Sequence, residues 1–203
     1  MSEISYNKLI RELKKNNVYM LIGNGAKNQF KHIGTLKKTI SEIIKNIPIG
    51  SNFLYFGDYP DKKKPDIGYA FKLLSTMRKD INIYMIQILD AKSWGVPDFV
   101  KGVFWHNSYT QKCKWGGLNN KNIPCSNTLK WVKINQKIPS GITKIFILGG
   151  GNITMDEFSL IKKYNIPYKY FIIERRYLND GKTKTKKKDS LNTKIGITQS
   201  LSK

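Results

Sequence analysis

Two spacings of hydrophobic residues alternate along the chain. Between residues 4 and 15 the apolar side chains Ile4, Leu9, Ile10 and Leu13 fall on one face of a predicted helix. The same spacing predicts helices over residues 35–45, 67–78 and 155–164. Short apolar runs predict buried strands over residues 18–23, 52–57, 81–88, 102–106, 144–148 and 168–173. Residues 128–134 alternate instead, which predicts an additional strand or hairpin arm.

This order of strands and helices predicts an α/β fold. Strands that alternate with helices imply crossover connections and parallel pairing. Runs such as FLYF and KIFIL are apolar without interruption, as in strands covered on both faces. Because crossovers are right-handed, we expect a Rossmann-like, doubly wound, mostly parallel sheet with helices on both faces.

The pattern also predicts the domain organisation. Residues 1–177 read as one Rossmann-like domain, in which residues 107–141 form an insertion beyond the core strands. From residue 178 the pattern stops, and the segment 181–203 carries seven lysines against one aspartate. We therefore expect residues 178–203 to be a basic, disordered tail.

Composition restricts the class of protein. No run approaches the roughly 18 apolar residues that span a membrane, so we expect no membrane association. No signal-peptide core follows the first helix, which favours a cytoplasmic location. Cys113 and Cys125 are too few for a disulfide framework and are expected to be buried thiols. Together with His106 they lack the paired spacing of a zinc site, so we expect no metal and no cofactor.

The charge balance is strongly basic. The chain has 36 basic and 14 acidic residues, a net charge of +22. Such a field favours polyanions, and non-specific nucleic acid could bind the lysine-rich surface and tail. The abundance of lysine, isoleucine and asparagine is also typical of AT-rich coding and resembles that of large DNA viruses of amoebae. Functional charge and coding bias therefore both remain open, and a viral origin would place the protein in the host cytoplasm or the virion.

The most informative turn is residues 148–157, LGGGNITMDE, which follows a predicted strand and opens a predicted helix. Three glycines without side chains let backbone N–H groups approach a phosphate closely. We expect Thr154 or Asn152 to cap the helix and Glu157 to complete a capping box. A side chain at Gly150 should displace the anion and leave the fold intact. The predicted ligand-binding residues here are Gly149, Gly150, Gly151, Asn152 and Thr154.

This turn resembles the signature of the SLOG superfamily, which includes the lysine-decarboxylase-like LOG proteins. That signature reads proline, two glycines, any residue, glycine, threonine, two residues and glutamate. Gly150, Gly151, Thr154 and Glu157 match it, whereas Gly149 and Ile153 replace the proline and the third glycine. The dipeptide Ile166-Pro167 before the last strand is also similar to the family. The resemblance covers about 30 residues and implies a nucleotide-binding Rossmann-like fold.

Two further turns are expected at the same edge of the sheet. Gly23, Asn24 and Gly25 follow the first predicted strand, and the resemblance implies that a nucleotide packs against such a turn. They do not complete a dinucleotide fingerprint, because residue 28 is asparagine. After the second strand, Asp58 is a candidate for a ribose hydroxyl, and Gly68 would let a helix start approach a ligand. Asp66 is placed to cap that helix.

The resemblance implies one catalytic candidate. LOG enzymes are nucleoside 5′-monophosphate phosphoribohydrolases that use the turn glutamate, here Glu157, with an arginine from a Met-His-x-Arg-Lys type motif. The chain lacks that motif, and Arg78 is its one arginine between residues 12 and 174.

The sequence therefore favours a protein that binds a nucleotide or a nucleotide derivative in its glycine-rich turns. A LOG-like hydrolase and a nucleic-acid-associated basic protein remain as alternatives. A homodimer also remains open.

Overall fold

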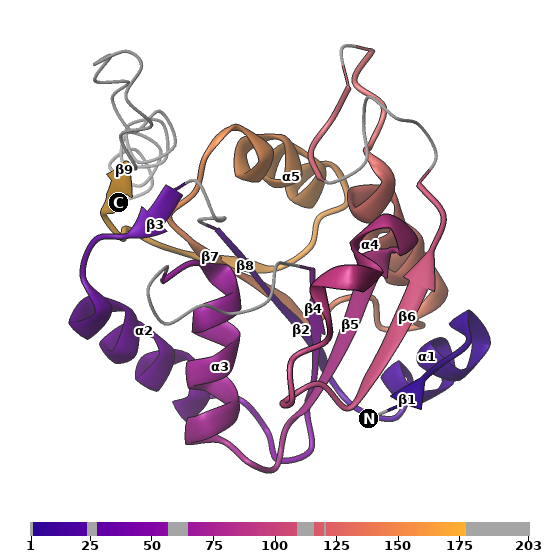
Figure 1. Ribbon diagram of the computed structural model, residues 1–203, viewed down its shortest axis with the longest axis horizontal. Coiled ribbons are helices and arrows are strands. Elements are labelled where there is room, and N and C mark those ends of the chain that lie inside the picture. The colour runs from indigo at the N-terminus through magenta and orange to yellow at the C-terminus, as the bar shows by residue number, and fades with distance from the viewer. Residues whose placement is uncertain (1, 24–27, 57–64, 109–115, 120, 178–203) are drawn as a thin grey trace.

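The computed structural model describes residues 2–23, 28–56, 65–108, 116–119 and 121–177. They form a seven-stranded, all-parallel sheet in the order β1-β6-β5-β4-β2-β7-β8 (Figure 1). The sheet strands are β1 (Ser2–Glu3), β2 (Val18–Gly23), β4 (Asn52–Tyr55), β5 (Asn82–Ile88), β6 (Gly102–His106), β7 (Lys144–Leu148) and β8 (Tyr168–Phe171). The helices are α1 (Tyr6–Leu13), α2 (Ile33–Lys45), α3 (Ile67–Met77), the short 3₁₀ helix η1 (Leu89–Trp94), α4 (Ser126–Lys137) and α5 (Asn152–Lys163).

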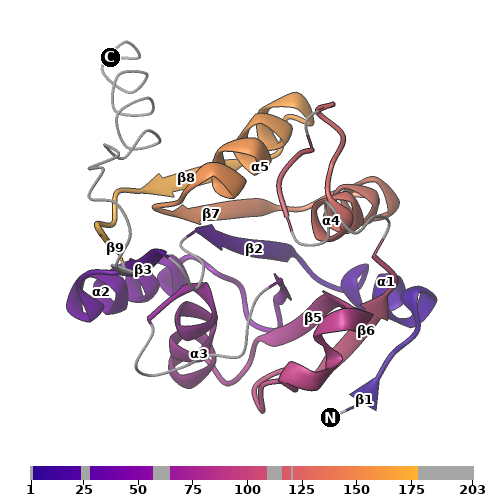
Figure 2. The ribbon, with the colours of Figure 1, turned by 45° about the horizontal axis from the view of Figure 1, so that its top comes forward.

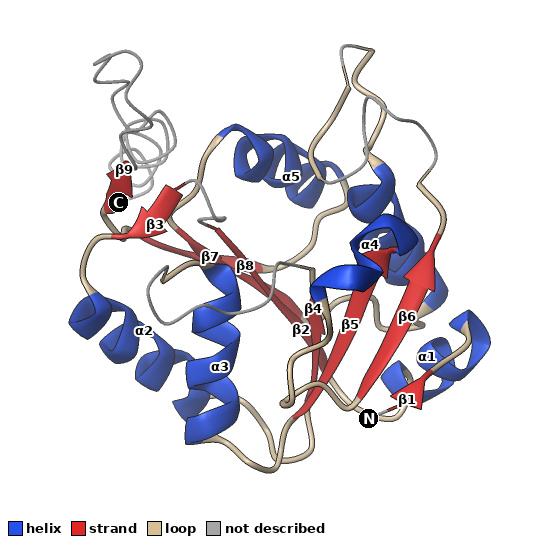
Figure 3. Ribbon diagram, in the orientation of Figure 1, coloured by secondary structure: helices blue, strands red, loops and turns tan. Residues whose placement is uncertain are grey.

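Helices cover both faces of the sheet, as Figure 3 shows. Val18, Met20 and Ile22 of β2 point into a core layer shared with α1, α4 and α5. Tyr19 and Leu21 point into the opposite layer, shared with α2 and α3. Because successive side chains of a strand alternate between faces, a continuously apolar strand supplies both layers. The prediction of a doubly wound α/β fold is confirmed.

The prediction of a strand over residues 128–134 is wrong, because these residues lie in helix α4. Within the predicted insertion 107–141, α4 connects β6 to β7 and packs on the sheet. Its buried residues Thr128, Trp131 and Val132 follow the i, i+3, i+4 spacing of a helix face. The β-branched residues of this segment suggested a strand, and burial of the helix face against the sheet overrides that local preference.

A small antiparallel ribbon was not predicted. Strand β3 (Asn28–Phe30) pairs with β9 (Arg175–Tyr177), so segments that follow β2 and β8 lie side by side (Figure 1). Each strand has only three residues, which is too short for a periodic signal. The ribbon also contacts the segment before α3, because the Phe30 N–H donates to the Pro65 carbonyl at 2.7 Å.

Cys125 is buried, as expected, but the expectation of a thiol is wrong, because Cys125 is disulfide-bonded. The only other cysteine in the sequence, Cys113, lies outside the described residues. Among the described helices, none combines the length and the apolar character that crossing a bilayer requires.

Candidate functional site

The strand order reverses at the centre of the sheet. From β2 the chain runs outward through β4, β5 and β6, and then returns to place β7 and β8 on the other side of β2 (Figure 2). In open parallel sheets, ligands bind beyond the carboxyl ends of the strands at such a reversal. Two of the glycine-rich turns predicted from the sequence, after β2 and after β7, begin at this point.

The β2 and β7 strands approach closely where they end. Gly23 is paired with Leu148, and a Cβ atom at Gly23 would lie 2.2 Å from the Leu148 carbonyl oxygen. Only glycine therefore fits this position. The hydroxyl of Thr154 on α5 donates to the Gly23 carbonyl at 3.2 Å, which fastens the start of α5 to the end of β2.

The turn from β7 into α5 is a tight left-handed one. Gly149 and Gly150 have φ angles of +62° and +140°, which strongly favour glycine. A Cβ at Gly150 would lie 2.5 Å from Thr154, so a side chain there would disturb the helix start itself. Gly151, by contrast, has an extended backbone, with φ −118° and ψ −157°, that any residue can adopt.

The predicted capping arrangement of α5 is wrong. The N-cap is Gly151, which has no side chain to accept a hydrogen bond from the helix start. Thr154 instead donates to Gly23, and the Glu157 side chain turns away to α4. The first turn of α5 also contains no acidic residue. Its N-terminal N–H groups, at the positive end of the helix dipole, thus keep their capacity to bind an anion.

Glu157 lies between α5 and α4, where its Oε1 accepts from the Thr128 hydroxyl at 3.3 Å. Burial raises the pKa of the Glu157 carboxyl to about 7, and the charge of Asp156 acts in the same direction. The Thr128 hydroxyl and the Trp131 indole N–H oppose this rise. A carboxyl whose pKa lies near neutrality can act as a general acid or base.

In the described part of the chain, no cation pairs with Glu157. Among the described residues, no lysine or arginine lies within ion-pair distance of it. Arg78, the arginine that the catalytic interpretation would need, is fully engaged elsewhere. Its Nε and Nη2 each donate to Asp80 at 2.6 Å, and its Nη1 donates to the carbonyls of Ile44 and Ile47. Arg78 therefore joins α3 to the end of α2 and takes no part in this site.

Hydrogen bonds to α4 and α5 hold the segment 116–118 beside Glu157. The Gly117 N–H donates to the Thr128 hydroxyl at 2.8 Å, and the Leu118 N–H donates to Asp156 Oδ2 at 3.0 Å. Gly117 has a φ of +85°, and a Cβ there would lie 2.7 Å from the Asp156 carboxylate. The consecutive acids of α5 thus have different roles: Asp156 anchors the segment, and Glu157 faces α4.

The remaining predicted residues have mixed outcomes. Asp66 caps α3 by accepting the Tyr69 N–H at 3.2 Å, as predicted. Gly68 is buried in the first turn of α3, on the opposite layer from α5. Asn24, Gly25 and Asp58 lie outside the described residues, as does the side chain of Asn152. The structure therefore brings together Gly23, the turn 149–151 and Thr154.

Sequence reasoning missed a buried polar network at the ends of β5 and β6. Gln87 Oε1 accepts from the Ile88 N–H at 2.9 Å and from Asn127 Nδ2 at 2.8 Å. Asn127 Oδ1 therefore faces His106 Nε2 at 2.8 Å, and His106 Nδ1 lies 3.0 Å from the Asn107 carbonyl oxygen, so both ring nitrogens face acceptors. Burial lowers the pKa of His106. No spacing in the sequence marks these residues, which together orient the first turn of α4.

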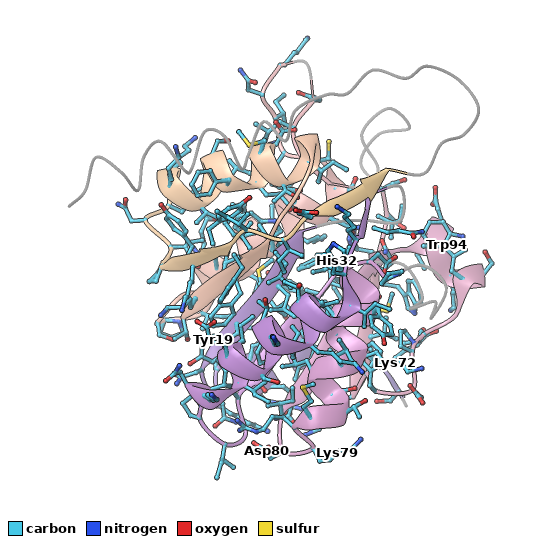
Figure 4. All side chains as sticks on the ribbon, turned by 90° about the vertical axis from the view of Figure 1, so that its left-hand side faces the viewer. Tyr19, His32, Lys72, Lys79, Asp80 and Trp94 are labelled. Atoms are coloured by element: carbon cyan, nitrogen blue, oxygen red, sulfur yellow. The ribbon has the colours of Figure 1, made fainter. Side chains whose placement is uncertain are left out.

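Two concave surfaces of the described residues lie at the opposite, amino edge of the strands. One, of about 270 Å³, is lined by Lys72, Lys79 and Arg78 beside the start of β5. The other, of about 580 Å³, lies at the starts of β7 and β8. Figure 4 shows Lys72, which lies on α3, and Lys79 beside Asp80 in the turn beyond the helix. Both surfaces are open, and neither contains a predicted ligand-binding residue. We therefore favour the strand reversal as the ligand site, because of its topology and its backbone N–H groups.

Comparison of the chain with protein-family models, curated proteins and solved structures finds no significant match.

Proposed function

We propose that this protein binds a nucleotide or a nucleotide derivative at the carboxyl edge of its sheet, with a phosphate at the start of α5. The observation that carries the proposal is the uncapped N-terminus of α5 at the strand reversal between β2 and β7. A phosphate there would accept backbone N–H bonds and meet the positive end of the helix dipole.

Gly151 supports this assignment more directly than the other glycines. Gly23 and Gly150 are required by the packing of β7 and Thr154, and Gly149 by its φ angle. Gly151 has no such backbone requirement, and it stands at the N-cap, where glycine is favoured together with serine, threonine, asparagine and aspartate but is the one that supplies no capping side chain. A glycine in place of a capping side chain leaves the N–H groups accessible to a ligand. The SLOG-type turn inferred from the sequence assigns the same position to the nucleotide.

A LOG-like nucleoside monophosphate hydrolase is the second candidate function. It is favoured by the pKa of about 7 at Glu157, the residue that the resemblance assigns to catalysis. The engagement of Arg78 with Asp80 and two carbonyls means that Arg78 cannot serve as the partner of Glu157. We therefore place binding ahead of hydrolysis.

Binding to nucleic acid is a third candidate, and the charge of +22 favours it. A polyanion held by surface lysines would dissociate steeply as salt rises. A nucleotide held mainly by backbone N–H groups would depend less on salt, because fewer charged contacts are made. Salt dependence therefore separates the two modes of binding.

The test combines native mass spectrometry with one matched pair of variants. We expect the gently purified full chain to carry a nucleotide-sized ligand, or to bind added AMP. Gly151→Ala should weaken AMP at least tenfold, about 1.4 kcal/mol, because the new methyl group occupies the anion's approach. Gly34→Ala, in the open first turn of α2, is the control and should leave affinity unchanged. Equal AMP affinity in both variants would place the binding site elsewhere.

A further inference from the structure

Two hydrogen bonds in series pass through Thr128, in the first turn of α4, and lead to the Glu157 carboxyl. The Gly117 N–H donates to Thr128 Oγ1 at 2.8 Å, and Thr128 is fully buried. A hydroxyl has a single proton, and a backbone N–H can only donate. The Thr128 proton is thus directed to Glu157 Oε1, 3.3 Å away.

Trp131, one turn further along α4, carries a second buried donor on the same helix face as Thr128. It is 1% exposed, and its Nε1 has no well-formed hydrogen bond in the described part of the chain. Its N–H nevertheless lies close enough to favour the charged form of Glu157. A buried indole N–H usually has a partner, so a tryptophan at this position needs an explanation beyond packing.

The other described groups around Glu157 are neutral or acidic. From α5 itself comes Asp156, whose charge disfavours a second carboxylate. From the segment 116–118, Gly116 lies beside the carboxyl and brings no charge, and a Cβ there would lie 3.6 Å from Glu157 Oε1. Within the described ranges no cation pairs with Glu157, so Thr128 and Trp131 are the two donors that stabilise its charge.

We infer that Thr128 and Trp131 are positioning residues that hold Glu157 as a proton-exchanging carboxyl beside the nucleotide crevice. The inference rests on the proposed function for its purpose, because a bound nucleotide is what the carboxyl would act on. Glu157 lies one helical turn beyond Thr154, which contacts Gly23 at the crevice. A carboxyl populated in both protonation states can donate a proton to a nitrogen of the ligand or accept one from a hydroxyl.

The test is a ¹³C NMR titration of the side-chain carboxyls in the full-length protein. The chain has only five glutamates, so Glu157→Gln assigns the resonance of interest directly. We expect Glu157 to titrate near pH 7. Trp131→Phe and Thr128→Val should each raise that midpoint by about half a unit or more, because each removes a donor to the charged form. Thr128→Ser keeps the hydroxyl and should restore the parent value.

Trp105→Phe is the matched control. Trp105 also has a buried indole nitrogen without a partner, but it packs in the opposite core layer, with α2 and α3. It should leave the Glu157 midpoint unchanged. A parent midpoint near ordinary glutamate values would overturn the inference, as would Trp131→Phe and Thr128→Val variants that titrate like Trp105→Phe.

Two further outcomes are separable. If Trp131→Phe does not fold, the comparison of Thr128→Val with Thr128→Ser decides, since the second retains the hydroxyl. If AMP fails to bind but the titration behaves as expected, the proposed function is wrong while the positioning of Glu157 stands.

Discussion

Replacing Glu157 by glutamine should make the protein more stable at neutral and alkaline pH. A glutamate in the unfolded chain has a pKa near 4.5, and burial raises the value in the folded protein to about 7. The folded state therefore binds this proton more tightly than the unfolded state does. Stability from Glu157 is fully present below pH 4.5 and is lost as the pH rises through about 7.

The size of the effect follows from the shift in pKa. A difference of one pKa unit corresponds to about 1.4 kcal/mol, so a shift from 4.5 to about 7 gives an upper bound of about 3 kcal/mol. Relaxation of the α4–α5 contact in the charged state would reduce this, and we expect between about 1 and 3 kcal/mol. Glutamine has the same shape and can still accept from the Thr128 hydroxyl, so it removes the charge with little change in packing.

The assay is urea unfolding, followed by tryptophan fluorescence, of the parent protein and Glu157→Gln between pH 5 and pH 8. The free energy of unfolding of the variant, minus that of the parent, should increase from pH 5 to about pH 7 and then level off towards pH 8. Glu42→Gln is the control, because Glu42 is exposed, and its difference from the parent should stay flat. A difference for Glu157→Gln that does not change with pH, or a variant less stable than the parent at pH 8, would refute the reasoning.

Two other predictions follow from the contacts of Thr154 and Arg78, and a third follows from the charge of residues 181–203. Thr154→Val removes the hydroxyl that bonds Gly23 and should lower the free energy of unfolding, measured in urea, by about 1 kcal/mol. An unchanged unfolding midpoint would show that this bond does not stabilise the start of α5. Arg78→Lys loses the two-pronged hydrogen bond to Asp80 and the bonds to two carbonyls. It should lower the free energy of unfolding by about 1 to 2 kcal/mol and leave AMP affinity unchanged. Loss of nucleotide binding or turnover would show that Arg78 also acts on the ligand. Deleting residues 181–203 removes seven lysines and one aspartate. The affinity for DNA or RNA should then fall less steeply as the salt concentration rises. An unchanged salt dependence would show that this segment does not bind the nucleic acid.

The sheet could be predicted because its strands are continuously apolar. The run at residues 18–23 supplies both core layers, and its length and terminal glycine matched the observed β2. Helix α4 could not be predicted in the same way. Its face is built from Thr128, Trp131 and Val132, which favour strands locally, and only packing against the sheet makes them helical.

The candidate site, too, could be predicted only in part from the sequence. The glycine turn was located correctly between a strand and a helix, but the sequence could not separate glycines needed for the fold from those free to serve a ligand. Gly150 illustrates this, because a side chain there would strike Thr154, so Gly150→Val cannot separate loss of ligand from loss of fold. The partners of Glu157 lie 26 and 29 residues away in sequence, at Trp131 and Thr128, and only the tertiary fold brings them together.

The most direct measurement is an amide chemical-shift map of the full-length protein titrated with AMP at moderate salt. Binding at the strand reversal predicts that the largest shifts fall on the amides of Gly149, Gly150 and Gly151 and on the first turn of α5, and that the shifts saturate. Shifts confined to lysine-rich surfaces such as the one around Lys72 and Lys79, or no shifts at any AMP concentration, would contradict nucleotide binding at this site.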